Sequence, residues 1–247
     1  MEAVNDAPYL RNRPESFVEA ADVILKLDSG DTLAAHSTLL SFHSDVFSDM
    51  LSLNKPGDSR FHVLPLSDCS LDDALSFLKC IYTRCEADRF CVEGAEAVAA
   101  LANKFGMDGI SKDLDKFLAG KVAPDGSSSA FWGADIDKAV HWLSEAGKNN
   151  LIHLAAKAER FLVQAGARLS DSPEAVHIPP SSLLRMLDSR HAAIVGLLET
   201  AKKCADTCLR SQIHGSYNAS CTLPTAAQDA LAEIKALKPV YSSVQST

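Results

Sequence analysis

Two histidines, His36 and His43, stand seven residues apart in the stretch LAAHSTLLSFHSDVFSDML, which covers residues 33–51. Imidazole is the side chain most often used as a catalytic base or metal ligand near neutral pH. A zinc site would need further ligands at defined spacing, and this stretch has no cysteine and only scattered acids. A catalytic Ser–His pair would need a nucleophile elbow, and the chain contains no Gly-x-Ser-x-Gly motif. We therefore predict structural roles: His36 bonds the backbone where a strand turns into a helix, and His43 interacts with the last carbonyls of that helix.

A second set of candidate metal ligands consists of Cys204, Cys208, His214 and Cys221. The first two share a helix face at i, i+4, but structural zinc sites usually combine two tightly spaced pairs of ligands. The second matched pair is missing here, so free thiols in a reducing compartment are the preferred interpretation. Of the seven cysteines in the chain, Cys80, Cys85 and Cys91 are expected to be half-buried core thiols.

No other pattern in the chain indicates catalysis. The sequence AGKNN at residues 146–150 lacks the upstream glycine and the following Ser or Thr of a phosphate-binding loop. The acidic residues are spread along predicted helix faces, and no carboxylate pair lies in an apolar surround. We assign no catalytic, cofactor-binding or metal-binding residue, expect no cofactor, and expect the protein not to be an enzyme.

Composition narrows the classes of partner. The chain has 247 residues, of which 47% are hydrophobic, and a net charge of −8, which allows one or two packed domains. Basic residues are scattered, with no run longer than the pair Lys202–Lys203, so no nucleic-acid partner is expected. The first residues lack the apolar core of a secretory signal, and no apolar stretch is long enough to span a bilayer. We expect a soluble protein of the cytoplasm or nucleus with no membrane partner.

The first half of the chain mixes strand and helix patterns. Residues 23–27 place Val23, Leu25 and Leu27 on one face at period two, and Gly30 fits a turn that returns the chain as a partner strand. Residues 61–66 alternate in the same way, and Pro65 indicates an edge strand. The expected helices have caps at Ser37 or Thr38, at Ser44, at Ser70 with Asp73, and at Asp108, and Gly106 and Gly120 end two of them. This order indicates the α+β class.

Apolar stripes predict the core of this first half. In residues 70–82, helical spacing joins one set of side chains into a single face, with Leu75, Leu78 and the later Leu101 expected at the centre. The members of that face are Leu71, Ala74, Leu75, Leu78, Ile81 and Tyr82.

Residues beyond 121 divide into a linker, a helical region and a tail. Residues 122–133 contain APDGSSSA and are predicted to be a linker, and residues 134–213 to be all-helical. Gly147 and Gly166 are expected to close two of these helices, and Pro179–Pro180 to precede a short helix followed by a longer one. Residues 1–16 are predicted to be a flexible N-terminus and residues 214–247 a mostly disordered tail. Two helix pairs also resemble each other at an offset of 44 residues, since GMDGISKDLDKFL aligns with NNLIHLAAKAERFL.

The assembled pattern resembles the BTB/POZ domain over about residues 17–121. The residues that carry the resemblance are Asp22–Val23, Ala35–His36, Ser44 with Phe47, Ile81–Tyr82–Thr83 and Leu101–Ala102. Residues 134–190 resemble more weakly the BACK-type helical extension that often follows this domain, through AAKAERFLV and IPPSSLLRMLDS. The resemblance implies a helical cluster flanked by a short mixed sheet, and a function in protein–protein association.

The resemblance also implies partners and site residues. Members of the family form homodimers, and many dock on a cullin scaffold as substrate adaptors of cullin-RING ubiquitin ligases. The signature pocket falls on Asp22, His36 and Ser37, and Phe17 is the dimer-interface candidate because relatives bury an N-terminal segment against the partner subunit. The partner-docking candidates are Met50, Leu51, Leu53 and Tyr82.

Two departures from the family pattern bear on these roles. The family usually has Arg or Lys after the Ala-His pair, where this chain has Ser37, so Asp22 is expected to lose that partner. Cullin-binding members often carry a hydrophobic-x-Glu motif before the edge strand, and residues 51–60 contain no Glu. The favoured function is a homodimeric interaction module that acts as a cullin adaptor for an unknown protein substrate. The alternative is a scaffold outside ubiquitination, in transcription or signalling.

Overall fold

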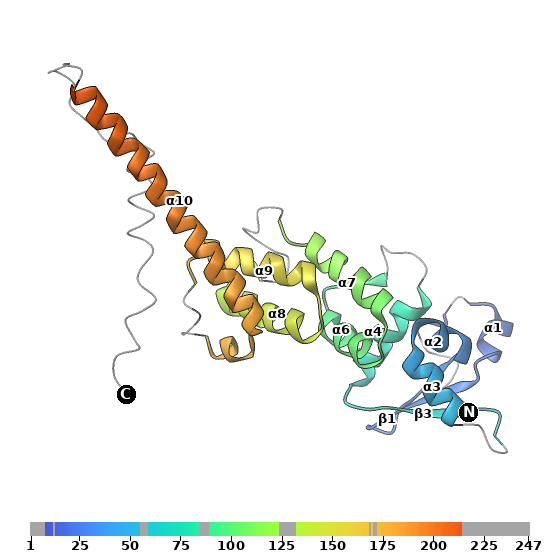
Figure 1. Cartoon of the computed structure of the whole chain (residues 1–247). Coiled ribbons are helices and arrows are strands. Elements are labelled where there is room, and N and C mark those ends of the chain that lie inside the picture. Colours follow the sequence, from blue (N-terminus) through green and yellow to red (C-terminus); the bar gives the residue numbers. More distant parts are fainter. Residues whose placement is uncertain are drawn as a thin grey trace, which may run out of the picture. The chain divides into compact units, whose positions relative to one another are not determined.

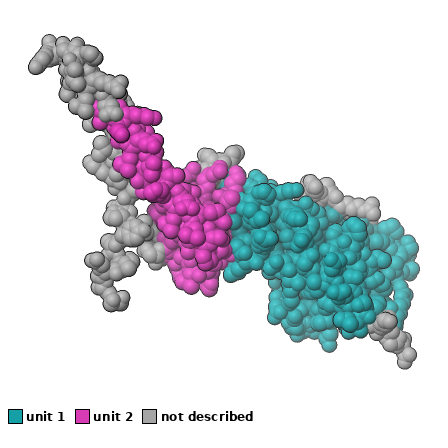
Figure 2. Space-filling model, viewed as in Figure 1, with its two compact units in different colours: residues 1–123, 129–131, 145–155 teal, residues 124–128, 132–144, 156–247 magenta. Residues whose placement is uncertain are grey.

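The structure of the chain is a computed structural model that describes residues 8–11, 13–54, 59–83, 89–123, 132–167, 169 and 172–213, with the backbone alone at 204 and 206–213. Two compact units are distinguished (Figure 2): unit 1 comprises residues 1–123, 129–131 and 145–155, and unit 2 comprises 124–128, 132–144 and 156–247. Most of the predicted linker lies outside the described residues, as does the predicted tail from residue 214. Residues 145–155, which the sequence places in the second region, group with unit 1.

Unit 1 combines a small mixed sheet with a cluster of helices, which confirms the predicted α+β class (Figure 1). Its elements are α1 (Glu15–Glu19), β1 (Val23–Leu27), β2 (Thr32–Ala35), α2 (Ser37–His43), α3 (Asp45–Leu53), β3 (His62–Leu66), α4 (Leu71–Tyr82), α6 (Ala95–Lys104) and α7 (Asp108–Gly120).

The sheet has the strand order β2-β1-β3. β1 pairs antiparallel with β2 and parallel with β3, so that Leu25 lies opposite Leu33 on one side and Leu64 on the other. Val23, Leu25 and Leu27 are buried, as their period-two spacing predicts. Pro65 lies on the edge strand β3, also as predicted, because a residue without an amide hydrogen is tolerated there. The turn between β1 and β2 uses Gly30 at a positive φ of 92°.

The residues before α1 are packed rather than free. Tyr9 and Leu10 are buried, and the Tyr9 hydroxyl donates a hydrogen bond of 2.7 Å to the carbonyl of Ala34 in β2. Within the segment predicted to be a flexible N-terminus, residues 1–16, Tyr9 and Leu10 are therefore packed against the domain. The physical reason is that a large aromatic side chain with a polar tip can bury its ring and still satisfy its hydroxyl.

Helix α4 starts at the predicted capping box. The Ser70 hydroxyl accepts from the backbone N–H of Asp73, and the Asp73 carboxylate accepts from the backbone N–H of Ser70. Its buried face is rotated from the predicted one, because α4 contacts both α6 and α2. Phe77 is fully buried although the stripe omitted it, Leu71 is exposed, and Leu75 is half-buried rather than central. The buried residues of α4 are Ala74, Phe77, Leu78, Cys80, Ile81 and Tyr82.

The predicted repeat at an offset of 44 residues is visible in two turns. Gly106 follows α6 at φ 60°, and Asn150 follows α8 (Ile136–Lys148) at φ 56°. In both turns the third residue beyond the helix donates a 2.8 Å hydrogen bond to the carbonyl five positions back, from Met107 N to Ala102 O and from Leu151 N to Ala146 O. This is the Schellman pattern of helix ends. Gly147 lies inside α8, so the predicted cap at Gly147 is wrong, and Asn150 takes the left-handed conformation instead.

The remaining elements are helical, as predicted: α9 (Ile152–Gln164), the 3-10 helix η3 (Pro173–His177) and α10 (Pro180–Ile213). The sequence predicted a short helix and a longer one after Pro179–Pro180, but α10 is continuous over 34 residues. No Gly or Pro occurs between Pro180 and Gly196, so nothing interrupts the backbone bonds where the division was expected. Within the part of the chain that the structure describes, no helix is long and apolar enough to cross a membrane.

Candidate interaction surface

His36 is held at the junction of β2 and α2 by three hydrogen bonds. Its backbone N–H donates to the Tyr82 hydroxyl oxygen at 2.9 Å, Nε2 lies 2.7 Å from the carbonyl oxygen of Phe17, and Nδ1 lies 2.7 Å from the Tyr82 hydroxyl. A carbonyl oxygen only accepts, so Nε2 carries the ring proton. In the neutral ring Nδ1 is then an acceptor, and it receives the hydrogen of Tyr82. Both ring nitrogens are occupied within the fold.

The contacts of His36 support the predicted structural role. His36 is buried and bonded on both nitrogens, so it offers no lone pair to a metal ion or to a reacting proton. The predicted structural role extends further than expected, because its partners lie 19 and 46 residues away in the sequence rather than at the junction. Among the residues that the structure describes, no group of three or more His, Cys, Asp or Glu side chains could hold a metal ion. The Cys204 to Cys221 set lies outside that search.

Phe17 anchors helix α1 against this histidine. Its ring stacks on the imidazole of His36 with centroids 4.3 Å apart and meets the ring of Tyr82 edge-on at 6.3 Å. The guanidinium of Arg13 lies 5.9 Å from the centroid of Phe17 and donates a bond to the carbonyl oxygen of Tyr82. Phe17 is nevertheless only half-buried. The dimer-interface candidate thus has partners within one chain and still presents part of its ring at the surface.

Asp22 and Ser37 form the rest of the signature pocket. The backbone N–H of Ser37 donates to Asp22 Oδ1 at 2.7 Å, and the Ser37 hydroxyl donates to Oδ2 at 2.5 Å. Ser37 therefore supplies neutral donors at the position where the resemblance implies a cation. The prediction that Ser37 or Thr38 caps α2 is wrong, because the N-cap residue is His36 and the Ser37 side chain is committed to Asp22.

A groove of about 370 Å³ runs beside this cluster, with α2 and α4 among the elements that line it. Phe42 lies on its rim with 81% of its surface exposed. His43 also lines the groove, and partial burial together with the nearby charge of Arg89 lowers its pKa below the ordinary value. An uncharged imidazole suits an apolar contact surface. The lining residues are Arg13, Phe17, Leu39, Phe42, His43, Ile81, Tyr82, Thr83 and Arg89.

The predicted partner-docking residues separate into two kinds. Leu53, at the C-terminal end of α3, is 83% exposed, and Met50 is half-buried. Leu51 and Tyr82 are buried within the chain. Tyr82 is drawn into the fold by its two hydrogen bonds to His36, and Leu51 lies on the buried face of α3. Leu53 does not line the groove, so it is a second, separate candidate contact site on unit 1.

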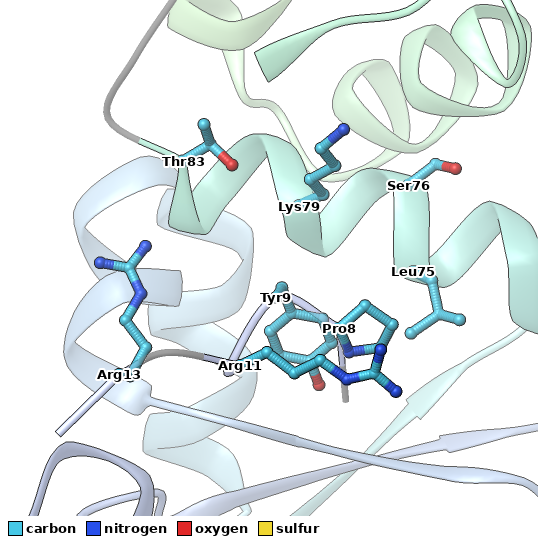
Figure 3. A pocket seen from close by; sticks show the side chains of 8 residues that line it. All are labelled: Pro8, Tyr9, Arg11, Arg13, Leu75, Ser76, Lys79 and Thr83. Atoms are coloured by element: carbon cyan, nitrogen blue, oxygen red, sulfur yellow. The ribbon is translucent and has the colours of Figure 1, made fainter. Parts of the chain in front are cut away.

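A second groove, of about 490 Å³, lies between the N-terminal segment and α4 (Figure 3). Tyr9, Arg11 and Arg13 come from the N-terminal segment, and Lys79 comes from α4 (Figure 3). Three cations and three hydroxyl groups among the lining residues suit an anionic group of a partner. The sequence did not indicate this groove, since its arginines and its lysine are about 70 residues apart. The lining residues are Pro8, Tyr9, Arg11, Arg13, Leu75, Ser76, Lys79 and Thr83.

Comparison with known families decides the identity of unit 1. Residues 12–121 match the family model described as BTB/POZ domain, which covers the sheet, the Asp22–Ser37 pair and the His36–Tyr82 cluster. Residues 12–121 are a BTB/POZ domain. No curated protein matches the chain.

BTB/POZ domains are protein-interaction modules, so the chain contains a module for protein–protein interaction. The helical region that follows the BTB/POZ domain is consistent with the predicted helical extension. The sequence drew attention to Tyr82 through the Ile81–Tyr82–Thr83 motif, but it did not show that the Tyr82 hydroxyl bonds His36. The structure also turns Phe42 of α2 outward at the groove.

Proposed function

We propose that this protein is a homodimeric adaptor in which the BTB/POZ domain pairs with a second copy through the surface formed by α1, α2 and the groove beside α4. The observation that carries this proposal is the exposure of Phe42 together with the half-buried Phe17, since both residues line one groove. Isolated exposed apolar side chains are common, but two aromatic rings beside one groove are typical of an interface. A two-fold interface suits one patch that meets its own copy.

The dimer is tested by analytical ultracentrifugation of the full chain at concentrations up to about 100 µM. The unaltered protein is expected to sediment as a dimer, and Phe42→Asp is expected to shift it to the monomer, because a buried unpaired carboxylate is costly. Leu53→Asp is the matched control, since it places the same charge at an equally exposed apolar residue outside the groove. An unaltered protein that stays monomeric, or a Phe42→Asp variant that stays dimeric, contradicts this interface.

The second part of the proposal is that Leu53 docks on a cullin scaffold. The exposed side chain at the end of α3 supports it, because Leu53 lies in the segment, residues 51–60, in which cullin-binding relatives carry their motif. A pull-down of purified cullin is expected to recover the unaltered protein and Phe42→Asp, and to lose Leu53→Asp. If cullin binds none of them, the alternative scaffold role in transcription or signalling replaces the adaptor role, and the dimer test stands independently.

A further inference from the structure

Helix α10 carries a row of exposed apolar side chains that unit 2 does not use. Five large apolar residues of α10 are between 39% and 61% exposed. A helix that packs on a domain normally turns such residues inward, so a row facing outward over several turns needs another explanation. The five are Leu184, Leu187, Ile194, Val195 and Leu198.

A different face of α10 attaches the helix to unit 2. Ser182 and Met186 are buried, and the Arg185 guanidinium donates to both carboxylate oxygens of the buried Glu159 in α9, at 2.6–3.2 Å. Arg190 donates a 2.8 Å bond to the carbonyl of Ala167. These contacts fix the orientation of the helix at its N-terminal half and leave the apolar row on another side.

The spacing of the apolar row is that of a coiled coil. Leu184, Leu187, Ile194 and Leu198 follow one another at intervals of three, seven and four residues, and His191 completes the alternating three and four. Extending the same register places alanines at positions 201 and 205, so the repeat covers three heptads. A repeat of 3.5 residues keeps a narrow seam facing one partner helix along its length.

We propose that α10 pairs with α10 of a second copy of this chain as a parallel two-helix coiled coil along this row. In that register each residue that flanks the seam lies opposite a residue of the second copy. The pairs between the two copies are Leu183 with Asp188, Arg190 with Val195, and Leu197 with Lys202. No like charges are opposed, so the charge pattern permits pairing of identical chains. His191 is the one polar residue on the seam within the described side chains, and a single polar residue there sets register at a cost in affinity.

The size of the seam explains why it acts together with the BTB/POZ domain. Three heptads are about 30 Å long and about 10 Å wide, or about 300 Å² per helix. Stable interfaces bury about 800 Å² per partner, so the seam alone is too small for a tight dimer. This inference rests on the proposed dimer, in which one contact raises the effective concentration for the other and strengthens the whole assembly.

The test measures the dimer dissociation constant of the full chain by analytical ultracentrifugation. The variant Leu187→Asp/Leu198→Asp is expected to weaken the dimer at least tenfold, because it introduces charges on the seam of both copies. The control Ser189→Asp/Thr200→Asp carries the same charges at the same spacing of eleven residues on an exposed part of α10 off the seam, and it is expected to change the constant less than twofold. Circular dichroism of each variant checks that the helix content is retained.

A third variant gives a change in the opposite direction. His191→Leu replaces the polar residue on the seam with an apolar one, and it is expected to tighten the dimer several-fold. A seam variant with an unchanged constant, together with no tightening by His191→Leu, overturns the α10 pairing even if Phe42→Asp confirms the proposed BTB/POZ interface. Conversely, a dimer that survives Phe42→Asp but dissociates in the seam variant overturns that interface and leaves the α10 pairing in place. An unaltered protein that is monomeric overturns both.

Discussion

The hydroxyl of Tyr82 is the residue-scale feature on which the N-terminal part of the BTB/POZ domain depends. It accepts a hydrogen bond from the His36 backbone N–H and donates one to His36 Nδ1. The other ring nitrogen of His36, Nε2, donates to the carbonyl oxygen of Phe17 in α1. Tyr9 supplies a simpler comparison, because its buried hydroxyl makes one bond, to Ala34. Burial raises the pKa of both tyrosines far above the ordinary value, so both hydroxyls keep their protons.

Tyr82→Phe is therefore expected to cost about 2–3 kcal/mol of the free energy of unfolding, because two buried polar atoms of His36 lose their partner. Tyr9→Phe removes the same atom from the same residue type but leaves a single carbonyl unsatisfied, and it is expected to cost about 1 kcal/mol. Urea denaturation of both variants measures the difference. Equal losses would show that the His36 cluster adds nothing beyond an ordinary buried hydroxyl.

Cys80 yields a prediction about reactivity. Burial raises the pKa of its thiol to about 12, and the thiol donates a 3.2 Å bond to the carbonyl of Arg89. Since the thiolate is the reactive form, only about one molecule in ten thousand is reactive at pH 8. Native-state alkylation at pH 8 is expected to label the exposed Cys91 and to spare Cys80, as read by peptide mass spectrometry. Denatured protein is the control, and labelling of Cys80 at the rate of Cys91 would show that its environment is open.

At the scale of elements, α4 links the sheet-side helices to the later helical pairs. It contacts α2 and α6, and the predicted central residue Leu78 is fully buried within it. The predicted stripe captured Leu78 and Ile81 but not Phe77, because a helix that contacts neighbours on two sides buries more than one stripe.

Leu78→Ala is expected to cost about 2–5 kcal/mol of the free energy of unfolding, through lost transfer energy and the cavity left behind. Leu71→Ala makes the same chemical change at an exposed position of the same helix, and it is expected to cost less than about 1 kcal/mol. Denaturant melts of the two variants give the comparison. A loss below about 0.5 kcal/mol for Leu78→Ala would contradict its central position.

At the scale of the whole molecule, metal content tests the interpretation of the late cysteines. Native mass spectrometry of the full chain is expected to show no stoichiometric zinc, because Cys204 and Cys208 lack a matched second pair of ligands. The check is a Cys204→Ser/Cys208→Ser variant, with Cys69→Ser/Cys91→Ser as the control that removes two cysteines elsewhere. One zinc per chain that disappears only in the first variant would make this region a metal site.

The sequence by itself determined the local elements. Apolar residues at every second position predicted β1, Pro65 predicted the edge position of β3, and the Ser70–Asp73 spacing predicted the start of α4. Gly106 and Gly166 predicted two helix ends correctly. Each of these features depends on residues within one or two turns of each other, so the pattern along the chain contains the whole of the physical cause.

Only the tertiary structure decided which distant residues meet. The sequence marked Asp22, His36 and Ser37 as one pocket through the family resemblance, but it did not pair His36 with Tyr82, 46 residues away. Nor did it show that Asp115 of α7 accepts from the first amides of α9, at His153 and Leu154, or that Phe42 turns outward while Tyr9 turns in. These outcomes depend on how several elements pack at once, because burial of one side chain is settled by the shape of all its neighbours.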